Sequence, residues 1–471
     1  MADTKSAGQK LKDELLVNDK NGWEGMSATE KKNINKFCDG YIDFLNVAKT
    51  EREAVKEAEA QAVKAGFKPL AKCKSLKAGD KVYYINRDKN ILLAVIGSED
   101  MEKGLNVVGA HIDSPRLDLK PNPLYEDSSF AYLKTHYYGG IKKYQWVTIP
   151  LAIHGVVALK DGSVVEIKVG DESDDMTFVI TDLLPHMARR QMEKKLSEGI
   201  EGEDLNLLIG SIPFDDEKVS EKVKLNIMQI LNEKYGIVEK DFLSAEIEIV
   251  PAFNAKSLGF DRSMVAGYGQ DDRVCAYTSL KAILETEAPK KTAICLLVDK
   301  EEIGSIGNTG MEARTFETFV GELLRLSKQD TDANVMNRVF ANSKMLSADV
   351  DGAFDPIYAS VAEKRNASYF GFGVGLNKYT GARGKSGAND ANAEFVAELR
   401  KLFDSNKVRF QISELGIVDE GGGGTIAYIL ANKGMDVIDC GTPVLSMHSP
   451  YEVTSKFDVY MSYKAYKVFM K

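Results

Sequence analysis

Five short segments of this chain place a histidine or an acidic residue directly after an apolar run. They are NVVGAHIDSP, MVAGYGQDDRV, ICLLVDKEEIGS, KMLSADVDGAF and VLSMHSPYE. In an open α/β sheet such residues come at the carboxyl ends of strands, which is where binding and catalytic sites are built. The side chains that these segments supply are His111, Asp113, Asp271, Asp272, Glu301, Glu302, Asp349 and His448.

Two imidazoles and several carboxylates are the ligands that a dinuclear metal hydrolase requires. Such a site takes about three protein ligands per ion, so two histidines and three acids suffice when one carboxylate is shared. Imidazole and carboxylate ligands without a thiolate favour zinc, with cobalt or manganese as substitutes. The residue types therefore predict two divalent metal ions per subunit, with zinc as the first expectation.

Two pairs of nearby residues suggest a division of roles. Asp113 lies two residues after His111, so on a strand it shares a face with this histidine and could orient the imidazole ring. Adjacent acids at a strand end can face different directions. One of Glu301 and Glu302 can therefore bind metal while its neighbour transfers a proton between water and a leaving amine.

Each of these residues also has an ordinary structural interpretation. Asp271 and Asp272 open a helical pattern, where acids commonly cap the helix N-terminus. Asp349 could be a turn residue at a strand end, and His448 could be a turn histidine. His111 could be a hydrogen-bonded structural histidine at a strand end, and Glu301 and Glu302 could be solvated acids on a charged loop. The prediction of a metal site therefore depends on all five segments converging on one place.

The first hundred residues read as helices followed by strands. Ser27 and Glu30 form a capping-box pattern, and the helical stretch EREAVKEAEAQAVKAGF ends at Gly66. After Lys81 the pattern changes to short apolar runs such as KVYYI and ILLAVIG, which are typical of buried strands.

A β-rich segment follows, and after it strands and helices alternate. KYQWVTIPLAIHGVVAL and SVVEIKVG flank the turn dipeptide Asp161-Gly162, which predicts a hairpin. Further on, TAICLLVDKEE, FETFVGELLRLS and similar stretches predict a sheet covered on both faces. We therefore predict an α/β fold: a catalytic domain over 1–118 and 251–471, with a mostly parallel sheet flanked by helices, and an inserted β-rich domain over 119–250.

Composition excludes several other classes of protein. The formal charge of -9 and the pI near 5.4 leave no broad basic surface, so we expect no nucleic-acid partner. The first residues contain no apolar signal region, and no run approaches the ~18 apolar residues of a membrane span, so we expect a cytoplasmic protein without a membrane partner. The five cysteines are scattered and show no CxxC spacing, which indicates reduced thiols.

Taken together and in order, the segments resemble the M18 family of metallo-aminopeptidases, the aspartyl aminopeptidase and aminopeptidase I group. The matching stretches are HIDSP at 111–115, QDDR at 270–273, DKEEIGS at 299–305, SAD at 347–349 and GTPVLSMHSPYE at 441–452. The resemblance implies that Glu301 is the general base and that Asp271 bridges two ions, although the family usually has Asp-Asn where this chain has Asp271-Asp272. The implied ligands are His111, Asp271 and Asp349 for one ion, and Asp271, Glu302 and His448 for the other.

The resemblance also implies an assembly. The β-rich insert would be a dimerisation domain, and the dimers would associate into a larger homo-oligomer, commonly a dodecamer. The stretch LLPHMARRQ resembles one in which a histidine, here His186, reaches the active site of a neighbouring subunit. The family often has a second histidine just downstream, where this chain has Arg189 and Arg190, so a plain surface position for His186 is the alternative.

Two stretches could line the substrate site. EGGGGTIAYILANKG places Gly424 and Thr425 at a predicted helix start, where backbone N–H groups can bind an anion or a developing oxyanion. LNKYTGARGKSGAND carries Lys378 and Tyr379, and the resemblance implies that this stretch shapes the substrate pocket. A flexible loop and a solvated basic loop are the respective alternatives.

The sequence as a whole predicts a dinuclear-metal aminopeptidase that removes the N-terminal residue from peptides through a metal-bridging water activated by Glu301. One alternative is another co-catalytic zinc hydrolase, such as a carboxypeptidase, a dipeptidase or a deacylase. The other alternative is a non-catalytic assembly protein built on a peptidase fold.

Overall fold

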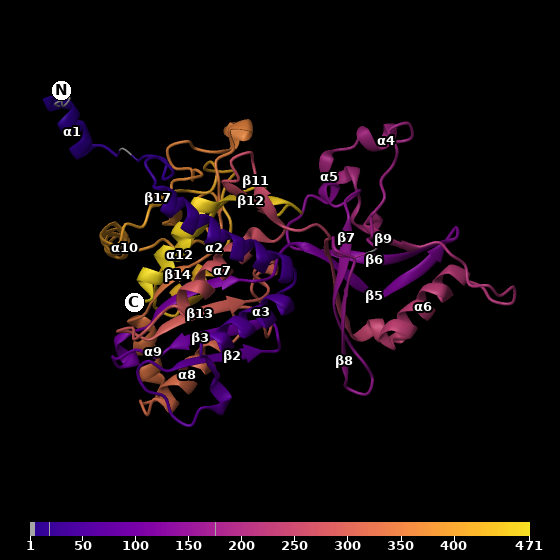
Figure 1. The fold of residues 1–471 in the computed structure, drawn as a ribbon, viewed down its shortest axis with the longest axis horizontal. Coiled ribbons are helices and arrows are strands. Elements are labelled where there is room, and N and C mark those ends of the chain that lie inside the picture. Colours follow the sequence, from indigo (N-terminus) through magenta and orange to yellow (C-terminus); the bar gives the residue numbers. More distant parts are fainter. Residues whose placement is uncertain (1–4, 18, 175) are drawn as a thin grey trace.

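The computed structural model describes residues 5–17, 19–174 and 176–471. Its two largest sheets form two lobes that lie side by side (Figure 1). One lobe is a sheet covered by helices on both faces, and the other is mainly β-structure. This is the α/β fold with a β-rich insert that the sequence predicts.

The helix-covered lobe is built on a nine-stranded mixed sheet in which most neighbouring strands run parallel. The antiparallel pairs are β2–β3, β3–β13 and β16–β18. The four central strands all run in one direction, so their carboxyl ends meet at one edge of the sheet. In spatial order the strands are β1 (Lys68–Pro69), β2 (Lys81–Asn86), β3 (Asn90–Val95), β13 (Ala293–Val298), β4 (Asn106–His111), β14 (Lys344–Ser347), β18 (Asp436–Gly441), β16 (Val374–Asn377) and β17 (Phe410–Ile412).

Two hydrophobic clusters cover the two faces of this sheet. Strands of the sheet contribute apolar side chains to both clusters because successive residues of a strand point to opposite faces. The helices of the first face are α2 (Ala28–Val47), α3 (Glu51–Lys64), α7 (Gln270–Leu284), α10 (Ala393–Ser405) and α12 (Lys456–Phe469). The helices of the second face are α8 (Thr315–Leu326), α9 (Ala333–Ala341) and α11 (Ala427–Ala431).

The second lobe contains an antiparallel six-stranded sheet with its own hydrophobic core. Helix α6 (Lys222–Tyr235) packs along β5 and β6, and the short helices α4 (Arg189–Met192) and α5 (Leu196–Gly199) lie in a long excursion between β8 and β9 (Figure 1). The strands in spatial order are β8 (Val164–Val169), β7 (Leu151–Ala158), β10 (Ala245–Pro251), β5 (Arg116–Asp127), β6 (Phe130–Tyr138) and β9 (Asn206–Gly210).

A third, five-stranded sheet carries two loops that lead to the candidate site. The strands of the third sheet are β11 (Lys256–Leu258), β12 (Met264–Gly267), β20 (Glu452–Ser455), β19 (Pro443–Leu445) and β15 (Asp351–Gly352).

Helix α1 (Ala7–Leu15) projects from the helix-covered lobe at the N-terminal end (Figure 1).

Several local predictions from the sequence are confirmed. Ser27 and Glu30 form a reciprocal capping box at the start of α2, and α3 ends just before Gly66, which has a φ of +88°. The Asp161-Gly162 turn joins β7 and β8 as an antiparallel hairpin. All five cysteines are free thiols. Among the helices of the described residues, none has the length and apolar character needed to cross a bilayer.

A buried histidine links the two lobes. His154 of β7 lies with Nδ1 3.0 Å from Glu53 Oε1 of α3 and with Nε2 3.2 Å from Asp171 Oδ1. Lys49 and Lys168 complete the cluster through pairs with Asp171 and Glu53. Burial alone would lower the pKa of His154, but its contacts with Asp171 and Glu53 raise that pKa above its usual value. The imidazolium form therefore helps to hold the lobes together.

We predict that His154→Ala lowers the free energy of unfolding by about 2 kcal/mol, because Glu53 and Asp171 lose their shared imidazole while each keeps a lysine partner. A histidine whose pKa is raised on folding contributes stability that is complete below its unfolded pKa and is lost as the pH rises through its folded pKa. The loss measured by urea denaturation should thus be larger at pH 6 than at pH 9. A loss that grows with pH would contradict the assignment of a charged imidazole.

Candidate metal centre

Three of the predicted segments meet because their strands are parallel neighbours in the large sheet. His111 is the last residue of β4, and Asp349 follows β14, which pairs with β4 on one side. Glu301 and Glu302 form a single helical turn after β13, which pairs with β4 on the other side. The parallel order β13-β4-β14 thus places these side chains at one sheet edge.

Asp271 lies between the two predicted histidine ligands. It occupies the first turn of α7, and His448 lies in the loop after β19. Asp271 Oδ1 is 3.1 Å from His111 Nε2, and Asp271 Oδ2 is 3.2 Å from His448 Nε2. The two oxygens of one buried carboxylate therefore face two different imidazoles.

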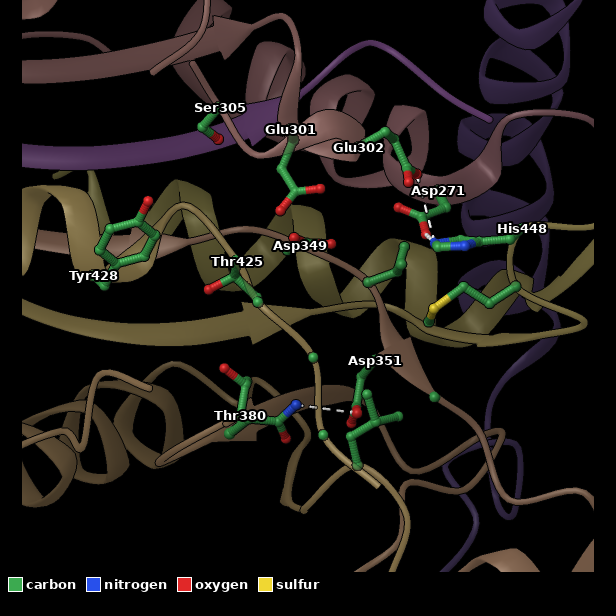
Figure 2. A pocket seen from close by; sticks show the side chains of 18 of the residues that line it. Asp271, Glu301, Glu302, Ser305, Asp349, Asp351, Thr380, Thr425, Tyr428 and His448 are labelled. Carbon is green, nitrogen blue, oxygen red and sulfur yellow. Dashed lines mark hydrogen bonds and ion pairs between the residues drawn. The ribbon is translucent and has the colours of Figure 1, made fainter. Parts of the chain in front are cut away.

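The remaining predicted acids lie on either side of Asp271. Glu302 Oε1 is 3.6 Å from His448 Nε2, on one side (Figure 2). On the other side, His111 Nε2 is 3.8 Å from Asp349 Oδ1 and 3.9 Å from Glu301 Oε2. The structure thus brings together every residue predicted as a metal ligand or as the general base.

The second nitrogen of each imidazole is held by a backbone carbonyl. His111 Nδ1 lies 3.0 Å from the carbonyl oxygen of Asp113, and His448 Nδ1 lies 2.9 Å from that of Gly140. A carbonyl oxygen only accepts, so each Nδ1 donates, and in the neutral tautomer this leaves the Nε2 lone pair free to bind metal.

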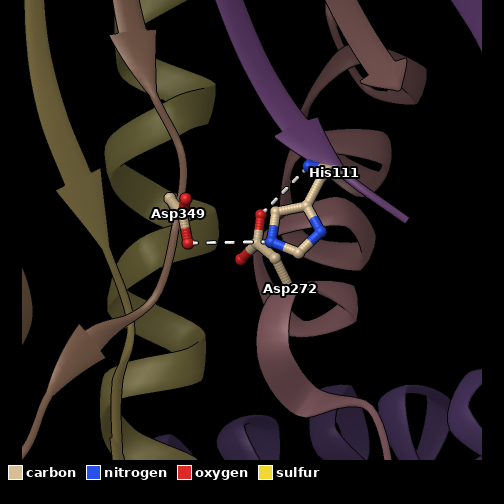
Figure 3. Close-up of side chains that lie close together, drawn as sticks. All are labelled: His111, Asp272 and Asp349. Atoms are coloured by element: carbon tan, nitrogen blue, oxygen red, sulfur yellow. Dashed lines mark hydrogen bonds and ion pairs between the residues drawn. The ribbon is translucent and has the colours of Figure 1, made fainter. Parts of the chain in front are cut away.

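Asp272 lies beside the cluster on its buried side. Figure 3 shows its carboxylate next to His111 and across from Asp349. Asp272 Oδ2 accepts the backbone N–H of His111 at 3.2 Å, and Oδ1 is buried without a hydrogen-bond partner among the described residues. These three side chains could also hold a cation, because their ligand atoms lie within 4.8 Å of one another. Asp271, by contrast, reaches both histidines.

The electrostatics of the cluster fit a cation. Burial raises the pKa of Glu302 well above its usual value, and the charge of Asp271 raises it further. Burial alone would lower the pKa of His448, but the hydrogen bond and charge of Asp271 raise it to about 10. Glu302 Oε1 is buried without a hydrogen-bond partner among the described residues. A bound divalent ion would stabilise the ionised form of these closely spaced, buried carboxylates.

Asp113 supports both sides of the cluster. Its fully buried carboxylate accepts the backbone N–H of Glu301 at 3.1 Å and that of Glu302 at 3.2 Å. Asp113 Oδ1 also lies 3.2 Å from His111 Nδ1. The contact with the His111 ring is the one that the two-residue spacing predicts, whereas the hydrogen bonds to the acidic turn were not predicted.

Glu452 is a buried residue that the sequence did not single out. Its two carboxylate oxygens accept the backbone N–H of Asp271 at 3.1 Å and that of His448 at 2.8 Å. Burial and the charge of Asp271 raise the pKa of Glu452 to about 8. Its position in the segment VLSMHSPYE, four residues after His448, is the only sequence signal that could have indicated this role.

A cavity of about 420 Å³ opens beside the cluster (Figure 2). Gly424 and Thr425 line it, as predicted for a substrate site. Helix α11 is only five residues long and begins at Ala427, so the glycines form a loop along the cavity wall and do not begin a helix. Tyr428 and Asp351 also line the cavity, and neither was predicted.

The other predicted substrate residues lie outside this cavity in the single chain. Lys378 pairs with Asp390 at 3.8 Å. The hydroxyl of Tyr379 donates to Glu414, next to a smaller neighbouring pocket. His186 is exposed in the segment that leads into α4. Within one subunit, these three side chains therefore do not reach the cluster.

The fold and the paired histidines and carboxylates define a metal-dependent hydrolase with an α/β catalytic lobe. Comparison with known families agrees: the model described as "Aminopeptidase I zinc metalloprotease (M18)" matches residues 44–470. The chain belongs to the M18 family and is a zinc metallo-aminopeptidase.

Individual relatives match over nearly the whole chain. A protein named "Probable M18 family aminopeptidase 1" from Clostridium acetobutylicum is 54% identical, covering 98% of this chain and 100% of its own. The crystal structure of the M18 aminopeptidase from Thermotoga maritima is 47% identical with a TM-score of 0.93, covering 97% of this chain and 100% of that chain. The S. cerevisiae mApe1 dodecamer, 22% identical with a TM-score of 0.75 and covering 93% and 97%, shares the fold.

We predict that Glu452→Ala destabilises the metal-free protein and weakens zinc binding. Loss of this acceptor leaves the buried N–H groups of Asp271 and His448 unsatisfied, at a cost of about 1–3 kcal/mol for each donor. Urea denaturation and a zinc competition assay with a chelator measure the two effects. The exposed Glu287→Ala is the control. If Glu452→Ala is as stable as this control and binds zinc as tightly, Glu452 does not position Asp271 and His448.

Proposed function

We propose that this aminopeptidase works with two divalent ions. Zinc is the expected metal, and cobalt or manganese are the substitutes. The observation that supports two ions is the contact of each Asp271 oxygen with a different histidine. Asp271 would bridge the ions, and Asp272 would hold the His111 backbone. The proposed ligands are His111, Asp271 and Asp349 for one ion, and Asp271, Glu302 and His448 for the other.

Glu301 is the proposed general base. Bound divalent ions would polarise the scissile carbonyl and lower the pKa of water. Glu301 lines the cavity next to the cluster, with its backbone held by Asp113. In the metal-free chain, burial raises the pKa of Glu301 to about 7. In the proposed reaction this carboxylate would first accept a proton from the attacking water and then donate it to the leaving amine.

The charge of the cavity favours a free N-terminus over a C-terminus in the substrate. Recognition of a terminal carboxylate would call for a cationic side chain, typically an arginine. Neither lysine nor arginine is among the described residues that line the cavity, and several carboxylates are. Four of the five acidic lining residues are the proposed ligands and base, whose charge two divalent ions would neutralise. The missing cationic side chain therefore decides the choice, and we propose an aminopeptidase and not a carboxypeptidase acting on the same scaffold. The acidic lining residues are Asp271, Glu301, Glu302, Asp349 and Asp351.

We propose that residues 119–250, which form most of the β-rich lobe, are a dimerisation domain and that the dimers form a larger homo-oligomer such as a dodecamer. Exposed apolar side chains gather in the excursion that contains α4 and α5, which suits contact with another subunit. His186 belongs to this excursion and could reach a neighbouring active site. A cytoplasmic location is proposed alongside, since the cysteines are free thiols. The apolar side chains are Leu183, Leu184, Met187, Met192 and Leu196.

We predict that Glu301→Gln retains its metal but loses turnover. Glutamine keeps the shape of the side chain and cannot accept the proton of the attacking water, so kcat should fall by about 10²–10⁴-fold. Release of the N-terminal residue from peptides with a free α-amine measures turnover, and elemental analysis of the same sample measures zinc.

The exposed Glu287→Gln serves as the matched control and should behave like the wild type. Peptides with a blocked N-terminus test the substrate class, because an aminopeptidase should not cleave them. Near-normal turnover of Glu301→Gln would rule out the general-base role. Faster cleavage of blocked peptides would instead favour a deacylase or a carboxypeptidase.

A further inference from the structure

The corner at the end of strand β6 in the β-rich lobe reaches the metal centre. It consists of Tyr138, Gly139 and Gly140, and each of these residues faces a different part of the cluster. The corner comes from a different lobe than the proposed ligands. Its contacts therefore connect the six-stranded sheet to the reacting groups.

The Tyr138 hydroxyl donates to Asp113 Oδ2 at 2.8 Å. Asp113 in turn accepts the backbone N–H groups of Glu301 and Glu302 and lies beside the His111 ring. Four groups thus converge on one carboxylate, and the tyrosine hydroxyl is the only one of them that comes from the β-rich lobe. Tyr138 therefore acts on the proposed general base and on a ligand through Asp113.

The Tyr138 ring is itself held in place within the β-rich sheet. Tyr138 pairs with Arg116 across β5 and β6, and the Arg116 guanidinium lies 3.9 Å from the centre of its ring. Arg116 is nearly buried and forms an ion pair with Glu248 of β10 at 3.1 Å. Because the ring stacks on a fixed cation, the direction of its hydroxyl is set by the sheet.

The two glycines after Tyr138 fit against the other side of the cluster. The carbonyl oxygen of Gly140 accepts from His448 Nδ1 at 2.9 Å, which turns Nε2 toward Asp271 and Glu302. Gly139 has a φ of +73°, and a Cβ atom there would lie 3.2 Å from Glu302 Oε2 and 3.3 Å from Glu302 Cβ. A side chain at this position would therefore press on the Glu302 side chain.

We infer that the corner Tyr138–Gly140 is a positioning element for the reaction: Tyr138 fixes Asp113, and the two glycines fix His448 and leave room for Glu302. The inference rests on the proposed function, because it concerns the same ligands and the same base. It makes the β-rich lobe a part of the active site within a single subunit, in addition to any role in assembly.

The first test is Tyr138→Phe, which keeps the ring on Arg116 and removes only the hydroxyl. We expect kcat to fall by about 10–100-fold with KM within about twofold of the wild type, because residues that orient ligands act on chemistry and metal affinity more than on substrate binding. The affinity for Zn²⁺, measured by competition with a chelator, should fall as well. The melting temperature of metal-free Tyr138→Phe should equal that of the metal-free control variant, Tyr137→Phe.

The matched control is Tyr137→Phe, the neighbouring tyrosine, which is 44% exposed. Equal kcat and equal Zn²⁺ affinity for Tyr138→Phe and Tyr137→Phe would overturn the role of the hydroxyl. A lower melting temperature of metal-free Tyr138→Phe with unchanged kcat and Zn²⁺ affinity would overturn it too, since the residue would then be structural only.

The second test compares Gly139→Ala with Gly162→Ala. Both glycines have a positive φ, of +73° and +88°, so both substitutions introduce similar backbone strain. A Cβ atom at Gly162 would meet nothing within 4 Å. We expect only Gly139→Ala to lose Zn²⁺ affinity, by about tenfold or more. Equal Zn²⁺ affinities of the two variants would overturn the role of Gly139.

The Zn²⁺ measurements separate this inference from the proposed function. If the wild type shows no metal-dependent release of N-terminal residues, the proposed function fails. A loss of Zn²⁺ affinity in Tyr138→Phe and Gly139→Ala, relative to their controls, would still support the positioning element. If the wild type is active and these affinities match those of the controls, the inference fails and the proposed function stands.

Discussion

The place of the Asp271 carboxylate between two imidazoles is the constraint on which the metal centre depends. The carboxylate is buried, and the backbone of Asp271 is fixed on both sides: its N–H donates to Glu452 and its carbonyl accepts from the Ser114 hydroxyl at 2.6 Å. Burying a charged group is costly unless it is paired. The surrounding groups therefore have to supply positive charge, and two divalent ions would do so.

The topology of the large sheet explains how residues far apart in the sequence come together. The parallel neighbours β13, β4 and β14 deliver Glu301, His111 and Asp349 to one edge. The third sheet brings Asp271 and His448, since β12 leads into α7 and β19 leads into the loop of His448. The six-stranded sheet contributes the Tyr138–Gly140 corner, which contacts Asp113 and His448. The two lobes thus share one site, which suits a cavity that must hold a substrate next to fixed ligands.

The sequence was sufficient to predict the fold class and the side chains of the cluster. An acid or a histidine directly after an apolar run is a local pattern, and the parallel sheet converts it into proximity at the strand ends. His111 and Glu301 are examples, since each needs only its own segment and the sheet order to be placed. The resemblance to the M18 family added the pairing of these residues into two ligand sets.

The groups that orient the cluster could not be predicted, because their partners lie on elements that the sequence does not relate. Tyr138 reaches Asp113 from the other lobe, and Glu452 holds two backbone N–H groups that have no side-chain signature. Only some of the predicted substrate residues line the cavity, and the reason is similar. Gly424 lines the cavity, whereas Lys378 is turned toward Asp390 by a local ion pair.

The most direct measurement of the central claim is anomalous diffraction at the zinc absorption edge from crystals of the zinc-loaded protein. The account predicts two peaks that both contact Asp271, one beside His111 and Asp349 and the other beside Glu302 and His448. A single peak, or a peak held by His111, Asp272 and Asp349 with Asp271 outside its ligand sphere, would contradict it.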